Sequence, residues 1–104
     1  MQIDYVWTPE EKRGTTAPLA VQAAMLRGAL AWRAKRVYWV VDITNEPMMN
    51  FVGEKVGAKK EGVIECYARM IDGRWSDSAV FALVGDNIQT AIDRIETKLR
   101  LEFP

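Results

Sequence analysis

Histidine is absent from this chain of 104 residues, and cysteine occurs once, as Cys66. Without an imidazole there is no Ser-His triad, no histidine ligand for a metal and no histidine base, which excludes most familiar hydrolases. One cysteine cannot close an internal disulfide, so packing alone must hold the fold together. That usage fits a reducing compartment.

An excess of either charge is also missing, because fourteen Lys and Arg residues balance fourteen Asp and Glu residues. A net charge of zero gives no overall field that attracts nucleic acid or an anionic membrane. The N-terminus lacks the basic and apolar regions of a signal peptide, and no uncharged run reaches the roughly 20 residues of a membrane span. We therefore expect a cytoplasmic protein with no nucleic-acid partner and no membrane partner.

The first half of the chain reads as strand, helix and strand. Residues 2–7 alternate as a strand does, and residues 16–32 form a long apolar segment in which Pro18 suits the first helical turn. Because all its faces are apolar, we expect this helix to be buried on more than one side. Residues 37–43 do not alternate, which is typical of a central strand covered on both faces; a buried helix has the same pattern, but the short length favours a strand.

The second half predicts a short helix from Met48 to about Val56, which Gly57 ends with a left-handed residue. Residues 64–70 and 78–84 read as the two strands of an antiparallel hairpin.

Alternation in the first strand of this hairpin places Cys66 on an apolar face, as a buried hydrophobic residue rather than a nucleophile. Helical spacing after Asp86 or Asn87 then predicts a C-terminal helix.

This order of elements predicts an α/β (α+β) fold in a single domain, residues 1–104. A strand-helix-strand unit of this length implies a parallel β-α-β pair with a right-handed crossover, and the hairpin extends the sheet antiparallel. We expect one mixed sheet followed by a C-terminal helix.

Three stretches resemble the GNAT superfamily of acyl-CoA-dependent acetyltransferases, particularly the subfamily that acetylates ribosomal-protein N-termini. Residues 12–17, KRGTTA, sit where that family places its pyrophosphate loop, and residues 40–45, VVDITN, resemble its next strand with a terminal asparagine. The most specific stretch is 53–63, GEKVGAKKEGV, followed by Asp72, Gly73 and Asp77 in the spacing of the family's last hairpin. The resemblance implies a truncated GNAT fold that lacks the family's N-terminal strands and helices.

The resemblance also implies a site for acetyl-CoA as co-substrate. Amides at a helix N-terminus bind diphosphates, and an arginine adds a fork of donors. The residues from Arg13 to Thr16 would hold the pyrophosphate, Asn45 and Phe51 would line the pantetheine arm, and two strand carbonyls would bond its amides. The cofactor-binding positions that the resemblance implies are Val6, Trp7, Arg13, Gly14, Thr15, Thr16, Asn45 and Phe51.

The chain departs from the family at several of these positions. Thr16 and Pro18 stand where glycines are usual, which removes one amide from the loop. The stretch from Asn45 to Gly57 is one residue longer than usual. The hydroxyl that often protonates the departing thiolate falls near Phe51, which has none.

Several of these residues have a purely structural interpretation as well. An Arg-Gly turn before a helix is often an ordinary cap, and Asn45 serves equally well as a turn residue. Met48 and Met49 suit core positions, and the four tryptophans suit the core or an interface. Asp4 and Glu65 are candidate bases and equally plausible surface charges, so catalytic residues stay unassigned, and no metal site is expected.

Two functions follow from the resemblance. The first is an N-acetyltransferase that transfers an acetyl group from acetyl-CoA to an amine of an unknown acceptor, a small molecule or a protein. The alternative is a non-catalytic remnant of the fold that works as a binding or regulatory module. Both predict a homodimer, because a chain that begins at the family's fourth strand leaves a strand edge and an apolar helix uncovered.

Overall fold

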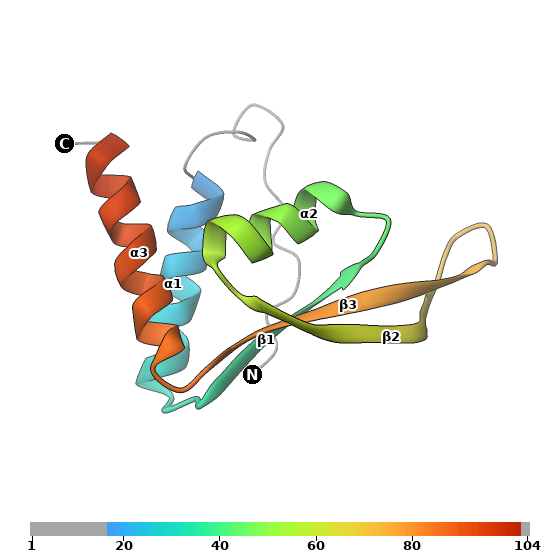
Figure 1. The fold of residues 1–104 in the computed structure, drawn as a ribbon, viewed down its shortest axis with the longest axis horizontal. Helices are drawn as coiled ribbons and strands as arrows, with labels where there is room; N and C mark the ends of the chain where they lie inside the picture. Colours follow the sequence, from blue (N-terminus) through green and yellow to red (C-terminus); the bar gives the residue numbers. More distant parts are fainter. Residues whose placement is uncertain (1–16, 103–104) are drawn as a thin grey trace.

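A computed structural model describes residues 17–102 of the chain; residues 1–16 and 103–104, including the predicted strand at 2–7, lie outside the described residues. The described elements are α1 (Ala17–Ala31), β1 (Arg36–Asp42), α2 (Glu46–Asn50), the π-helix η2 (Phe51–Val56), β2 (Lys59–Arg69), β3 (Trp75–Val84) and α3 (Asn87–Glu102). The helices gather at one end of the molecule, and the β2–β3 hairpin extends from it at the other (Figure 1). Among the described helices, none is long and apolar enough to cross a membrane.

The described sheet has three strands in the order β1-β3-β2, and both pairings are antiparallel. The hairpin and the C-terminal helix are confirmed, but the described sheet is not mixed, and residues 17–102 contain no parallel β-α-β unit. β3 folds back from the hairpin and enters between β1 and β2, which sets Phe81 opposite Trp39. The sequence did not reveal β3 as the central strand of the described sheet, because hydrophobic periodicity identifies strands but not which strands pair.

Strand β1 alternates, contrary to the expectation of a strand covered on both faces. Val37, Trp39 and Val41 are buried, whereas Tyr38 and the residues that alternate with them are only half-buried or exposed. The strand lies at the edge of the described sheet, and only one of its two faces is fully covered. On that face the indole N–H of Trp39 donates to the Gln22 side chain of α1 at 3.2 Å, which gives each of these buried polar groups a partner.

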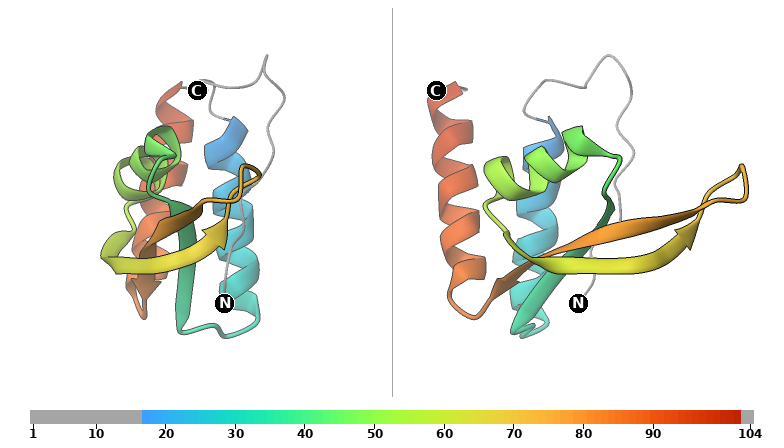
Figure 2. Two further views of the ribbon diagram at one scale, coloured as in Figure 1. Left: turned by 90° about the vertical axis from the view of Figure 1, so that its right-hand side faces the viewer. Right: turned by 45° about the vertical axis from the view of Figure 1, so that its right-hand side comes forward.

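Helix α1 is buried on one side only, which corrects the expectation of burial on several sides. Leu19, Ala23, Leu26 and Ala29 are buried together with α3 residues such as Ile88, Ile92 and Ile95. Small residues of α1 occupy the solvent side. The two helices lie side by side (Figure 2), and an ion pair from Arg27 to Glu96 joins them.

Cys66 is exposed, so its predicted burial is wrong. Its φ angle of 49° and the shifts in register between Ile64 and Ala68 mark an irregularity in β2. All of β2 except Ala68 is exposed, so the period-two pattern identified the strand but not whether another layer covers it. The amide N–H of Cys66 donates to the carboxylate of Asp77, at 2.9 Å.

Candidate functional site

The candidate site starts at the carboxyl end of β1, where the chain turns into α2. The carboxylate of Asp42 accepts hydrogen bonds from the backbone N–H of Thr44 at 2.8 Å and from its hydroxyl at 2.6 Å. The amide of Asn45 donates to the Asp42 carbonyl at 2.9 Å, which closes the turn. Short side chains that bond nearby backbone in this way fix such turns. The turn therefore holds Asn45 in one orientation at the end of the strand.

Asp42 is a titratable group that the sequence did not single out. Hydrogen bonds from the Thr44 hydroxyl, from Ser76 and from the Thr44 amide hold the pKa of Asp42 below its ordinary value of 3.8. A carboxylate with a lowered pKa stays ionised at neutral pH and is a weak base. Asp42 is therefore suited to positioning this turn and not to removing a proton. Its pattern, Asp-x-Thr after a strand, is the signal that would have found it.

Asn45 is the N-cap of α2, because its side-chain oxygen accepts from the amide of Met48 at 3.3 Å. This is the turn role that was considered beside the cofactor role, and it leaves the side-chain NH₂ pointing away from the cap contact. Phe51 lies at the junction of α2 and η2 and is half-buried against the core. Met48 and Met49 of α2 are also half-buried against the core. The two methionines pack against the core from half-buried positions, whereas core positions were predicted.

Asn45 and Phe51 are the two predicted site residues that the structure describes. Val6, Trp7, Arg13, Gly14, Thr15 and Thr16 lie outside the described residues. The described chain does place a helix start immediately after them, since α1 begins at Ala17. The start of α1 lies on the same side of the fold as α2 (Figure 1).

The segment between Asn45 and Gly57, which the sequence predicts to be one residue longer than in the family, contains the π-helix η2. In a π-helix each N–H bonds the carbonyl five residues earlier, as Gly57 does to Val52 at 3.1 Å, so each turn holds more residues than in an α-helix. Both Val52 and Val56 stay fully buried. Gly53 faces β3 so closely that a Cβ there would lie 3.3 Å from the Phe81 ring. Single-turn π segments inside helices are frequent at functional sites.

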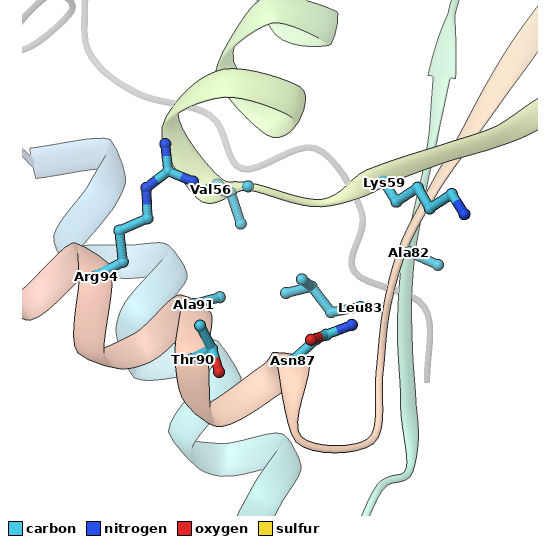
Figure 3. Close-up of a pocket in the computed structure, with 9 residues that line it drawn as sticks. Val56, Lys59, Ala82, Leu83, Asn87, Thr90, Ala91 and Arg94 are labelled. Carbon is cyan, nitrogen blue, oxygen red and sulfur yellow. The ribbon is translucent and has the colours of Figure 1, made fainter.

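A hollow of about 200 Å³ lies between the end of η2 and α3 (Figure 3). Arg94 reaches over it from α3, and its guanidinium donates to the Glu54 carbonyl at 2.9 Å. This contact satisfies a carbonyl at the end of η2, which has no partner within its own helix. We assign Arg94 this structural role. Within residues 17–102, no three His, Cys, Asp or Glu side chains gather as a metal site would require.

The sequence matches no family model and no curated protein, whereas the fold matches solved structures. A candidate acetyltransferase and a second one from T. thermophilus are each 27% identical, with TM-scores of 0.86 and 0.84, over 94% of this chain and 51% and 53% of theirs. Mycobacterium smegmatis RimJ, solved in complex with CoA-disulfide, is 22% identical, with a TM-score of 0.77 over 95% of this chain and 48% of its own.

The described residues therefore form a partial GNAT-like fold, and the chain spans about half the length of the acetyltransferases that it matches. This confirms the structural part of the resemblance found in the sequence. At this level of identity, the similarity to RimJ concerns the fold alone.

Proposed function

We propose that this chain binds acetyl-CoA and transfers its acetyl group to an amine, as a GNAT-type N-acetyltransferase of the kind that acts on ribosomal proteins. The observation that carries the proposal is the match of 94% of the chain to a candidate acetyltransferase, with a TM-score of 0.86 and 27% identity. The CoA-disulfide held by the RimJ structure supports coenzyme A as the ligand.

The cofactor would lie between the start of α1 and the end of β1. Arg13, Gly14, Thr15 and Thr16 directly precede α1, where unsatisfied amides and the helix dipole favour a diphosphate. The side-chain NH₂ of Asn45, fixed by the turn at Asp42, would donate to the pantetheine arm. Phe51 would contact that arm, and the carbonyls of Val6 and Trp7 would accept from its amides.

In the proposed reaction the amine attacks the thioester carbon directly, the thiolate leaves, and the amine loses a proton. Bound coenzyme supplies the activated acetyl group. The chain supplies proximity and backbone N–H groups for the thioester oxygen. Asp42 is a weak base, and Phe51 carries no hydroxyl for the thiolate, so proton transfers are assigned to solvent or to the acceptor.

A second candidate function is a non-catalytic binding or regulatory module. One observation favours it: Phe51, near which the family's proton-donating hydroxyl falls, has none. The module need not bind coenzyme A. Ligand binding therefore separates the two candidates before any acceptor is known.

Calorimetric titration with acetyl-CoA tests the proposal, with thermal shift as an independent readout in case the enthalpy is near zero. We expect micromolar binding that Arg13→Ala with Thr16→Ala weakens at least tenfold. The matched control is Arg33→Gly, which changes an arginine at the other end of α1 and should bind as wild type does. No heat and no rise in melting temperature at millimolar acetyl-CoA would exclude cofactor binding and leave the module.

A further inference from the structure

α2 and η2 form one continuous helix over residues 46–56, although their backbones are bonded differently. Asn50 and Phe51, at the junction, both have right-handed helical angles, and the amide of Phe51 donates to carbonyls of the preceding turn. Asn45 caps the start of this helix, and Gly57 ends it. A change of register at one end is therefore transmitted to the other end.

The end of this helix keeps the π register, in which an amide bonds the carbonyl five residues earlier. An α-helix would give the amide of Ala58 to the carbonyl of Glu54. Here the amides of Gly57 and Ala58 both donate to the carbonyl of Val52, each at 3.1 Å. The Glu54 carbonyl accepts instead from the guanidinium of Arg94, at 2.9 Å. Because only the π register takes the Ala58 amide away from this carbonyl, the contact with Arg94 stabilises that register.

Arg94 reaches the end of η2 from α3, across the hollow of about 200 Å³ (Figure 3). Thr90 and Ala91, one turn earlier on α3, line that hollow and do not fill it. Gly57 leaves room for the guanidinium, since a Cβ there would lie 2.8 Å from its Nη1 atom. The side chain of Arg94 is thus a hydrogen-bonded link from α3 to the last turn of the helix.

We propose that Arg94 is a positioning residue for the coenzyme. By holding the Glu54 carbonyl it keeps η2 in the π register, and that register sets the positions of Asn45 and Phe51. One residue of an α-helix turns by about 100° and rises by about 1.5 Å. A slip of one residue at η2 therefore moves Asn45 and Phe51 by about those amounts relative to Val56. A displacement of more than about 1 Å is enough to break a hydrogen bond.

The effect on the coenzyme rests on the proposed function, in which Asn45 donates to the pantetheine arm and Phe51 contacts it. Arg94 lies at the other end of the helix and acts on the coenzyme only through these two residues. The effect on Asn45 and Phe51 themselves needs no coenzyme, so it can be measured in the free protein.

Nuclear magnetic resonance of the free protein is the first test. Arg94→Met keeps an unbranched side chain and a good helix former but removes the donor. We expect it to shift the side-chain NH₂ signal of Asn45 and the ring signals of Phe51, with circular dichroism as in the wild type. Arg94→Lys keeps a donor and should retain the wild-type signals. Arg100→Met, in the last turn of the same helix, is the matched control and should shift neither residue.

Calorimetric titration with acetyl-CoA is the second test. Arg94→Met should weaken binding about tenfold, as the loss of one hydrogen bond does. In an Asn45→Ala background the same change should have a much smaller effect, because it acts through the position of Asn45. Arg94→Ala replaces Arg94→Met if circular dichroism shows that the latter is misfolded.

Unchanged signals of Asn45 and Phe51 in folded Arg94→Met, or an equal loss of affinity in both backgrounds, overturns the proposal. A wild-type chain that binds no acetyl-CoA overturns the proposed function instead. The shifts at Asn45 and Phe51 in the free protein then decide whether Arg94 sets the register.

Discussion

Arg33, just beyond α1, holds a backbone conformation that usually belongs to glycine. Its φ is 60°, its amide donates to Leu30, and the next amide, of Ala34, donates to Ala29, each at 2.9 Å. These two bonds define a Schellman motif with Arg33 at the left-handed position. Arg33→Gly should therefore stabilise the fold by about 0.5–1 kcal/mol, measured by urea unfolding. Arg33→Ala removes the same side chain without relieving the strain, so an equal gain there would contradict the explanation.

Across the sheet, the ion pair of Glu61 on β2 with Arg36 on β1 makes stability depend on pH. Hydrogen bonding to the guanidinium holds the pKa of Glu61 below its ordinary value of 4.5. Because the folded-state pKa is the lower one, the stabilisation is present above about pH 4.5 and is lost as pH falls through the folded value. Glu61→Gln should thus reduce the fall in melting temperature between about pH 5 and pH 3. Glu54→Gln, at an exposed carboxylate on η2, should keep the wild-type slope.

Single residues were predictable from the sequence where local geometry decides their role. Asn45 follows an apolar strand and precedes Pro47, so a turn residue was a natural interpretation, and the structure shows it as the N-cap of α2. Gly57 was identified as the left-handed stop that it is. The exposure of Cys66 was not predictable, because a strand's pattern does not tell whether another layer covers it, and all of β2 except Ala68 is exposed. Turns and caps depend on residues that are neighbours in the sequence, whereas strand register depends on a strand that is distant in the sequence.

At the scale of elements, η2 should tolerate the loss of one residue. Removing Glu54, which is exposed, lets residues 51–56 close as an α-helix, with Val52 and Val56 still on one face because three and four residues both span about one turn. We expect the melting temperature to fall by less than about 5 °C. Deleting exposed Asp93 from α3 is the control, since it rotates Ile95 away from the core and should unfold the chain. An equal fall in melting temperature for both deletions would contradict the interpretation of η2 as a helix with one inserted residue.

Two glycines in helical segments should respond in opposite ways to alanine. Gly57 has a φ of 87°, and an added Cβ would lie 2.8 Å from the guanidinium of Arg94. Gly57→Ala should destabilise the fold by about 1–2 kcal/mol. Gly28, within α1, has open space around it, and Gly28→Ala should stabilise by about 0.5–1 kcal/mol. Denaturant unfolding measures both, and a loss at Gly28 would show that its backbone is covered in solution.

Elements with a clear period were predicted and their order in the sheet was not. The spacing of Ile88, Ile92 and Ile95 indicated α3, and alternation indicated the hairpin. No pattern within β1 or β3 states that these two strands are neighbours, because that choice depends on how the hairpin twists back over the core. The π-helix was visible only as one surplus residue against a family pattern.

Seen as a whole molecule, the chain is small for the apolar surface that it carries. Among the described residues, the buried core involves α1, η2, α3 and one face of the sheet, while Val63, Ile64 and Ile71 of the hairpin are exposed. The matched acetyltransferases are about twice as long.

The homodimer predicted from the sequence would couple folding to assembly, and the melting temperature would then depend on protein concentration. When a dimer unfolds directly to two chains, each tenfold rise in concentration adds about 1.4 kcal/mol to its stability. With an unfolding entropy of about 2.1 cal/mol/K per residue for two chains, the melting temperature should rise by about 3 °C per decade. A wild-type melting temperature that stays constant from about 5 to about 500 μM would mean that each copy folds and unfolds alone.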